Sequence, residues 1–304
     1  MDSKNLFFKI KKSYLEFLKS QQVQGEPFYN KIDQLKKFYI PICKYIYKNY
    51  LLKKKTLIIG LSGGQGSGKT TITNILKIIL QKGLSLRVVS FSIDDFYKTL
   101  NQRKKMSQEE HGLFLTRGVP GTHDIKLLKK CLNSLTKKKF KSCYIPKFNK
   151  SIDDRYKKKN WTKVKKKPQI IIFEGWCVGA KPQTNNILKK PINSLEKKLD
   201  TKNFWRIKVN NELKNRYKVI FKFIDKLIFL KVPSFKYIYK WRILQEKKLK
   251  KRQKGKKIMT KQQMKTFVMY YERITKQMLI DLTLKANILI RLDKKHRLNK
   301  LKFN

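Results

Sequence analysis

The amino-acid sequence predicts an α/β fold in which a mainly parallel β-sheet is flanked by helices. Short continuous apolar runs recur along the chain, and such runs are typical of strands that are buried on both faces of a parallel sheet. Segments with helical spacing of apolar residues separate these runs, which is the alternation that this class requires. A glycine-rich segment follows the first run directly. The predicted strands are residues 56–62, 86–93, 169–175, 226–232 and 287–292.

The first 54 residues are predicted to form a helical N-terminal extension. Leu6, Ile10 and Tyr14 recur at helical spacing, and Gly25–Pro27 separates this helix from a second one. We expect the extension to pack as a cap on the main domain, and a surface for a partner is the alternative. Residues 55–304 then form the main domain, since 304 residues suit one large domain or two small ones.

The glycine-rich segment GGQGSGKT, residues 63–70, fits the pattern G-x-x-x-x-G-K-[ST]. It lies between the first strand and a helix predicted over 70–83, and this context is the one that a phosphate-binding loop needs. Glycines let successive N–H groups point at a phosphate, and the helix adds the positive end of its dipole. A turn that binds nothing is the alternative. The predicted nucleotide-binding residues are Gly63, Gly64, Gln65, Gly66, Ser67, Gly68, Lys69, Thr70 and Thr71.

Within this loop, Lys69 is expected to reach the β- and γ-phosphates, and the Thr70 hydroxyl is expected to bind Mg²⁺. Carboxylates follow two other predicted strands, at the edge where α/β sheets bind ligands. We assign Asp94 as the base that accepts a proton from an acceptor hydroxyl. Asp95 would support it through Mg²⁺ or the acceptor, and Glu174 would hold Mg²⁺ through its water shell. The alternatives are a helix N-cap for the aspartates and a strand-end turn for Glu174.

The chain carries 75 basic and 20 acidic residues, a formal net charge of +55. Its lysines are scattered over the whole sequence, which favours a compositional bias over a selected nucleic-acid patch. We therefore expect weak, non-specific binding of polyanions and no specific nucleic-acid partner. The sequence does not predict the oligomeric state.

The cysteines and the apolar runs bear on the compartment. Cys43, Cys131, Cys143 and Cys177 form no CxxC pair and no zinc-site spacing. A reducing compartment fits them best, and we expect a cytoplasmic protein. The N-terminus lacks the features of a secretory signal, and charges interrupt every apolar run too early for a membrane span.

Five segments occur in an order that resembles the D-glycerate 3-kinase family and related P-loop small-molecule kinases. This group is itself similar to phosphoribulokinase, uridine kinase and bacterial pantothenate kinase. The resemblance spans roughly residues 55–295 and implies a P-loop fold and an ATP- and Mg²⁺-dependent kinase. The acceptor would be a small hydroxy-acid, with D-glycerate to 3-phosphoglycerate as the best-known case. The segments are GGQGSGKTT, SIDDFYKT, TRGVPGTHD, FEGWCVGAKP and WRILQE.

The resemblance also implies roles for residues whose surroundings say little alone. It makes Asp94 the general base, and it places Arg117 and His123 toward the acceptor. Lys150 and Arg155 are candidates for pairing with an acceptor carboxylate or the transferring phosphate, and a solvated side chain is the alternative for Lys150. Asn149 stands where the family has aspartate, which leaves the identity of the acceptor open.

In the relatives, the region corresponding to roughly 235–265 is a helical lid over the nucleotide. Arg242 would then approach the phosphates and stabilise transition-state charge when the lid closes. Another acceptor, such as a nucleoside, a sugar acid or pantothenate, is the alternative among kinases. The alternative outside them is a nucleotide-dependent nucleic-acid-binding protein. It is less favoured because neighbouring aspartates would repel the phosphates of DNA.

Overall fold

The computed structural model describes residues 2–22, 28–252 and 259–304, with the backbone alone for residues 245–252. Gly25–Pro27, predicted as a break between helices, therefore lies outside the described residues. A six-stranded sheet runs through the centre in the order β10-β9-β8-β1-β7-β2. All neighbouring strands are parallel except β9 and β10. The strands are β1 (Leu57–Gly63), β2 (Val88–Ser92), β7 (Ile170–Gly175), β8 (Lys226–Lys231), β9 (Ile288–Leu292) and β10 (Leu298–Phe303).

The sheet is buried on both faces, as its apolar runs predict. Along β1, Ile58 points into one hydrophobic core, whereas Leu57 and Ile59 point into the other. The same alternation holds for Ile171 and Ile172 of β7. Side chains on a strand alternate between faces, so an apolar residue at every position requires a cover on both sides. The predicted fold class, a mainly parallel sheet flanked by helices, is confirmed.

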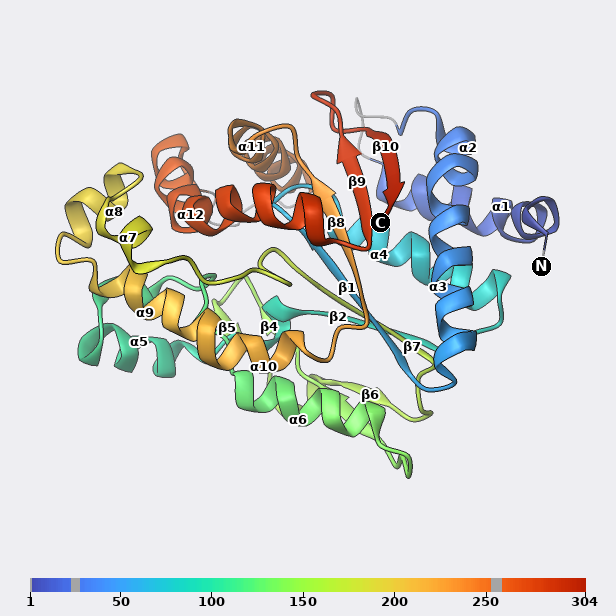
Figure 1. The fold of residues 1–304 in the computed structure, drawn as a ribbon, viewed down its shortest axis with the longest axis horizontal. Coiled ribbons are helices and arrows are strands. Elements are labelled where there is room, and N and C mark those ends of the chain that lie inside the picture. Colours follow the sequence, from blue (N-terminus) through green and yellow to red (C-terminus); the bar gives the residue numbers. More distant parts are fainter. Residues whose placement is uncertain (1, 23–27, 253–258) are drawn as a thin grey trace.

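Two groups of helices supply these covers (Figure 1). The N-terminal helices and the helix after β1 contribute to the core that contains Leu57. They are α1 (Ser3–Gln21), α2 (Lys31–Gln34), α3 (Ile40–Lys53) and α4 (Lys69–Ile78). The opposite core is built mainly from helices in the middle of the chain. The helices between β2 and β8 are α5 (Leu100–Glu109), α6 (Ile125–Thr136), α7 (Asn185–Lys189), α8 (Ser194–Leu199), α9 (Phe204–Glu212) and α10 (Lys218–Phe221).

Several short elements were not among the sequence predictions. Two small antiparallel pairs, β3 with β6 and β4 with β5, lie between α6 and β7. The helix predicted over 70–83 ends as α4 at Ile78 and continues as a π-helical turn, Ile79–Gly83. The two pairs are formed by β3 (Cys143–Ile145), β6 (Thr162–Val164), β4 (Phe148–Asn149) and β5 (Asp154–Arg155).

The region predicted as a lid begins with α11 (Phe235–Arg252), directly after β8, and includes the start of α12 (Lys261–Lys285). Residues 253–258 of that region lie outside the described part of the chain. The first turns of α11 rest on the glycine-rich loop, because a Cβ on Gly64 would lie 2.5 Å from Ile238. In the part of the chain that the structure describes, no helix is long and apolar enough to cross a membrane.

Candidate active site

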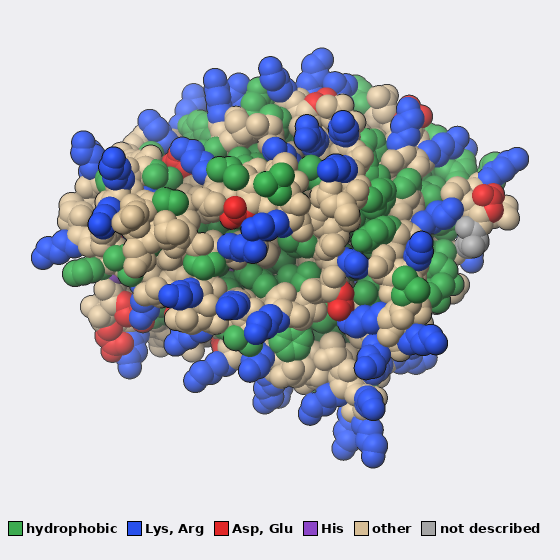
Figure 2. Space-filling model, viewed as in Figure 1, with side chains coloured by type: hydrophobic (Ala, Val, Ile, Leu, Met, Phe, Trp, Pro, Cys, Tyr) green, Lys and Arg blue, Asp and Glu red, His purple; other side chains and the backbone are tan. Residues whose placement is uncertain are grey.

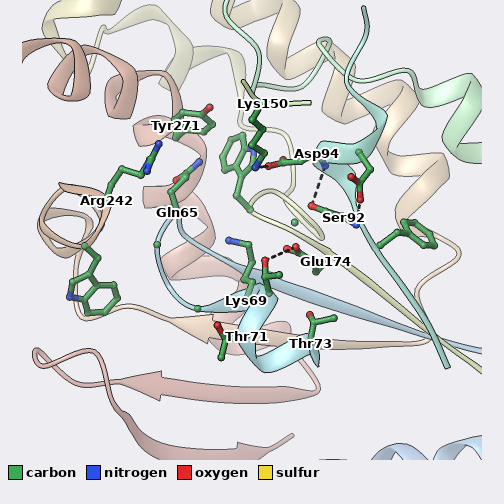
Figure 3. Close-up of a pocket in the computed structure, with 18 of the residues that line it drawn as sticks. Gln65, Lys69, Thr71, Thr73, Ser92, Asp94, Lys150, Glu174, Arg242 and Tyr271 are labelled. Atoms are coloured by element: carbon green, nitrogen blue, oxygen red, sulfur yellow. Dashed lines mark hydrogen bonds and ion pairs between the residues drawn. The ribbon is translucent and has the colours of Figure 1, made fainter. Parts of the chain in front are cut away.

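A cavity of about 600 Å³ lies where β1, β2 and β7 end. Parallel strands present their carboxyl ends at one edge, and in open α/β sheets this edge is where ligands bind. Most of the residues that the sequence predicts for a site line this cavity, and many are visible in Figure 3. They are Gln65, Gly66, Gly68, Lys69, Thr70, Thr71, Asp94, Asp95, Arg117, Lys150, Glu174 and Arg242.

The loop between β1 and α4 has the backbone shape of a phosphate cradle. Gly66 and Gly68 adopt φ angles of +74° and +88°, a region that favours glycine. The Lys69 ammonium donates to the Gly64 carbonyl at 3.0 Å. Gly63, Gly64 and Ser67, also predicted to bind nucleotide, are not among the residues lining the cavity. α4 begins at Lys69, so its positive end faces the cavity.

Buried polar groups around this loop fit a phosphate ligand. Among the described residues, the Ser67 hydroxyl and the Gln65 amide are buried without a hydrogen-bond partner. Buried polar groups normally have partners, so a ligand with many acceptor oxygens would satisfy the Nε2 donor of Gln65, which lines the cavity. Burial lowers the pKa of Lys69, which Glu174 and Asp94 partly offset. A bound phosphate would restore the preference of Lys69 for its charged form.

Thr70 and Glu174 together fit a magnesium ion. The Thr70 hydroxyl donates to Glu174 Oε1 at 3.2 Å, so both oxygens lie at one point beside the loop. Mg²⁺ prefers oxygen ligands and keeps several waters beside one or two protein groups. A magnesium site of this kind does not require a cluster of three His, Cys, Asp or Glu side chains, and the described residues contain no such cluster. Burial raises the pKa of Glu174, which a cation at this point would reverse.

Asp94 lies at the start of a 3₁₀ turn directly after β2, and each of its oxygens has a partner. The Tyr97 hydroxyl donates to Oδ1 at 2.9 Å, and the Lys150 ammonium donates to Oδ2 at 2.9 Å (Figure 3). Burial alone would raise the pKa of Asp94, but Lys150, His123 and Tyr97 lower it overall. Asp94 in turn raises the pKa of Lys150. The pair is therefore ionised at neutral pH.

Asp95 takes part in a cap at the start of this turn, but the N-cap residue is Ser92 and not either aspartate. Its Oδ2 accepts a hydrogen bond from the Ser92 amide at 3.1 Å, and the Ser92 hydroxyl accepts one from the Asp94 amide. This capping box fixes the turn that carries Asp94. Burial raises the pKa of Asp95. Its carboxylate also borders the cavity, and its role toward Mg²⁺ or the acceptor stays a prediction.

Arg117 reaches the cavity from the loop after α5. Its guanidinium forms an ion pair with Asp153, which also pairs with the fully buried Arg103 at 3.0 Å. Its carbon Cζ lies 5.5 Å from the centre of the Phe148 ring. Arg242 enters from α11 and extends toward Gln65 (Figure 3). The cavity thus gathers four predicted cations, namely Lys69, Arg117, Lys150 and Arg242.

His123 and Arg155 lie one layer behind the cavity lining. The His123 ring is 2% exposed and stacks on Tyr97 with ring centres 4.5 Å apart. Burial lowers the pKa of His123 to about 3. Arg155 donates to the Tyr97 carbonyl at 2.6 Å and pairs with Asp124 at 3.3 Å. Both side chains support Tyr97 in this structure, and their predicted contact with the acceptor stays a prediction.

Aromatic residues that the sequence analysis did not assign to the site complete the cavity. Tyr97, Trp176 and Tyr271 also line it. The Trp176 indole donates to the Gly118 carbonyl at 2.9 Å, and the Tyr271 hydroxyl donates to the Arg117 carbonyl at 3.2 Å, so both shape the loop that carries Arg117. Tyr97 follows Asp94 by three residues, and that spacing in a 3₁₀ turn is a signal that could have identified it.

Comparisons with known proteins agree with this geometry. Residues 58–193 match the phosphoribulokinase / uridine kinase family. The chain is 34% identical over 219 residues to the uncharacterized kinase mug58 of Schizosaccharomyces pombe, covering 69% of this chain and 77% of that protein. It is 31% identical over 223 residues to the chloroplastic D-glycerate 3-kinase of Arabidopsis thaliana, covering 71% of this chain and 46% of that protein.

A solved structure shows the same fold. The D-glycerate 3-kinase of Cryptococcus neoformans superimposes with a TM-score of 0.73 at 24% identity, covering 87% of this chain and 98% of that one. The sequence relationship to mug58 extends over most of both proteins. The chain therefore belongs to the phosphoribulokinase / uridine kinase family of P-loop small-molecule kinases.

Proposed function

We propose that the protein is an ATP- and Mg²⁺-dependent kinase that phosphorylates a hydroxyl group of a small hydroxy-acid. The best candidate reaction converts D-glycerate to 3-phosphoglycerate. One observation carries the proposal: a carboxylate suited to act as a base, Asp94, shares a cavity with the phosphate loop and with two cations, Arg117 and Lys150. The cations suit the carboxylate of an acceptor that presents its hydroxyl to Asp94. The similarity to a plant D-glycerate 3-kinase supports the same acceptor.

The residues of the cavity divide the work of phosphoryl transfer. The loop amides and Lys69 hold the β- and γ-phosphates, and Thr70 and Glu174 would hold Mg²⁺. When bound, the ion neutralises developing charge on the phosphates. Asp94 takes the proton as the acceptor O–H bond breaks. The acceptor oxygen then forms its bond to the γ-phosphorus while the bond to the bridging oxygen of ADP breaks. Arg242 would stabilise the charge on the transferring group.

Asn149, which stands where the resembled family has aspartate, leaves the identity of the acceptor open. Asn149 accepts hydrogen bonds from the amide and the hydroxyl of Ser151, at 3.0 and 2.5 Å, so it shapes the turn that presents Lys150. A nucleoside, another sugar acid or pantothenate is the second candidate acceptor.

We also propose that the enzyme is cytoplasmic. All four cysteines are free and buried, which supports this proposal.

The test is a screen for ADP release over hydroxy-acids, sugars, nucleosides and pantothenate, with D-glycerate first. We expect the highest kcat/KM with D-glycerate and formation of 3-phosphoglycerate. A higher kcat/KM with a nucleoside or pantothenate would replace the acceptor and keep the kinase. Stimulation by polynucleotide alone would overturn the proposal and favour the nucleic-acid alternative.

The variant Asp94→Asn tests the base. We expect kcat to fall by about 10² to 10⁴, the usual contribution of a positioned acid or base, because an amide cannot take the proton. The Kd for a non-hydrolysable ATP analogue should stay within about twofold, because the loop that holds the phosphates is unchanged. The matched control is Asp33→Asn, which removes an exposed carboxylate that pairs with Lys37 at 3.6 Å. Full turnover by Asp94→Asn would exclude Asp94 as the base.

A further inference from the structure

The two oxygens of Asp94 have partners of different kinds. Oδ1 accepts from the Tyr97 hydroxyl and Oδ2 from the Lys150 ammonium, both at 2.9 Å. Tyr97 is 3% exposed, whereas the side chain of Lys150 is 63% exposed. A buried neutral donor is a fixed partner, whereas the ammonium of a long and mostly exposed side chain can turn away from a carboxylate that is itself only 26% exposed. Oδ1 is therefore held, and Oδ2 is the oxygen that becomes accessible.

Contacts on several sides hold the Tyr97 ring in place. It stacks on His123, and the edge of the Phe148 ring lies against it with centres 5.2 Å apart. The guanidinium of Arg155 donates twice to the Tyr97 carbonyl, at 3.1 and 2.6 Å. Close packing of this kind restricts a side chain to one rotamer. The hydroxyl therefore keeps its direction toward Asp94.

A second hydrogen-bonded layer fixes His123 behind the Tyr97 ring. The Tyr217 hydroxyl accepts a hydrogen bond from the Gly121 amide at 3.1 Å and shares one with His123 Nδ1 at 2.5 Å. All three side chains of this stack are almost fully buried. Because Tyr217 is tied to both Gly121 and His123, neither ring can rotate without losing a hydrogen bond.

Lys150, in contrast, lies on the turn between β4 and β5, and its neighbours anchor the base of that turn. Asp153 is held by Arg103 and Arg117, and Asp154 accepts from the Leu100 amide at 3.1 Å. The Lys150 ammonium alone reaches over to Asp94. An acceptor that brings a carboxylate into the cavity offers Lys150 another anion in place of Asp94. When the Lys150 ammonium moves from Asp94 to that anion, Oδ2 is free to accept a hydrogen bond from the acceptor hydroxyl.

We propose that Tyr97 is a positioning residue for Asp94, which it holds by Oδ1 so that Oδ2 receives the proton of the acceptor. Lys150 leaves Oδ2 as the acceptor carboxylate arrives. The acceptor O–H bond then breaks with its proton moving to Oδ2, the new bond to the γ-phosphorus forms, and ADP leaves. The inference rests on the proposed function, since it concerns the base of that reaction.

The test compares variants of the two partners of Asp94. Tyr97→Phe keeps the ring and removes the hydroxyl, and we expect kcat to fall about 10- to 100-fold, the effect of losing a hydrogen bond to a charged group. The acceptor KM should stay within about twofold. Lys150→Met should instead raise the acceptor KM by about tenfold or more, because it removes the ammonium that binds the carboxylate. The control Tyr270→Phe removes a half-buried hydroxyl that contacts Thr116 at 3.3 Å and should leave kcat and KM unchanged.

A wild-type kcat for Tyr97→Phe, or a change in acceptor KM alone, would overturn the inference. A second measurement does not depend on the acceptor. In a crystal structure of Tyr97→Phe, we expect the Asp94 carboxylate to be rotated from its wild-type orientation. An unchanged orientation would also overturn the inference. If no acceptor is found in the screen, the proposed function fails while this structure still decides the role of Tyr97.

Discussion

His123 connects the chemistry of the site to the stability of the protein. Its ring lies between Tyr97 and Tyr217 and is 2% exposed, and burial lowers its pKa from 6.5 to about 3. The neighbouring carboxylate of Asp94 favours the imidazolium, but burial outweighs it. The folded protein therefore holds a neutral imidazole across the physiological range of pH, and protonation of His123 opposes folding.

We predict that the free energy of unfolding falls as the pH falls from 6.5 toward 3. In this window the unfolded chain binds a proton at His123 and the folded chain does not, so acid favours the unfolded state. The stabilisation is fully present above pH 6.5, and each pH unit below it removes up to about 1.4 kcal/mol through this residue. Urea unfolding measured at several pH values checks the slope.

The control for this pH dependence of stability is the variant His123→Phe, which keeps an aromatic ring against Tyr97. The variant loses the hydrogen bond to Tyr217, so its stability should be lower than that of the wild type at neutral pH. Its dependence on pH between 6.5 and 3 should nevertheless be shallower than that of the wild type. An equal slope in both proteins would show that other groups, and not His123, take up the protons.

Single residues differ in how far the sequence identifies them. Lys69 and Thr70 follow from a local pattern because they belong to a loop between a strand and a helix. Asp94 follows from another because it comes directly after the end of a strand. Tyr97 depends on contacts with Phe148 and Arg155, which lie about fifty residues away along the chain. No local pattern encodes such contacts, and the same holds for the position of His123 behind the lining.

At the scale of elements, the glycine-rich loop and α11 are in close contact, with little room for a side chain at Gly66. A Cβ on Gly66 would lie 3.3 Å from the carbonyl carbon of Trp241 and 3.4 Å from the amide nitrogen of Arg242. Gly66 therefore serves twice, through its φ of +74° and through the space it leaves for the helix. This approach is what brings Arg242 to the cavity beside the loop.

We predict that Gly66→Ala destabilises the protein more than Gly68→Ala does. Both residues have left-handed backbones, so each substitution costs about 1–2 kcal/mol in backbone strain. A Cβ on Gly68 would meet nothing within 4 Å, whereas one on Gly66 would press on the backbone of α11. Forcing α11 away should add about 1 kcal/mol or more for Gly66→Ala. Thermal or urea unfolding without nucleotide measures the difference, and equal losses would show that α11 does not rest on the loop in solution.

The elements themselves were largely predictable, with exceptions that have a physical cause. Continuous apolar runs identify β1 and β7, which are buried along their whole length, and β8, which is buried at its centre. The pairs β3–β6 and β4–β5 are two or three residues long and mainly exposed on one side, so they carry no apolar pattern. The turn between β4 and β5 nevertheless carries Lys150. The sequence therefore predicted this residue of the site but not the strands that position it.

Over the whole molecule, the N-terminal helices share a core with the sheet. Leu6 and Ile10 of α1 approach Gly83, where a Cβ would lie 2.5 Å from Leu6. The same core contains Leu57 and Ile59 of β1. Helices that share a core with the central strand contribute to its stability, which agrees with the expected cap. The domain boundary at residue 54 stays a prediction.

The net charge of the whole molecule predicts how it binds polyanions. Lysine and arginine side chains are spread over the face shown in Figure 2, with few acidic groups between them, and the formal net charge is +55. Such a surface attracts phosphates by its charge, and phosphate contacts carry no base-sequence information directly. We predict that a random 20-base-pair duplex binds at low salt and that its affinity falls by about 10³ to 10⁵ between 50 and 200 mM salt, as expected for 6–10 phosphate contacts.

Fluorescence anisotropy with two duplexes of different sequence checks this prediction. The two affinities should be equal at each salt concentration, and polyglutamate should compete with both, because only charge density matters for release of counterions. Tight binding of one duplex at 200 mM salt would contradict a compositional origin of the charge. In that case, substituting lysines in one region at a time would have to locate a selective surface. A uniform loss over all regions is the result that a dispersed charge requires, since each lysine then contributes one screened contact among many.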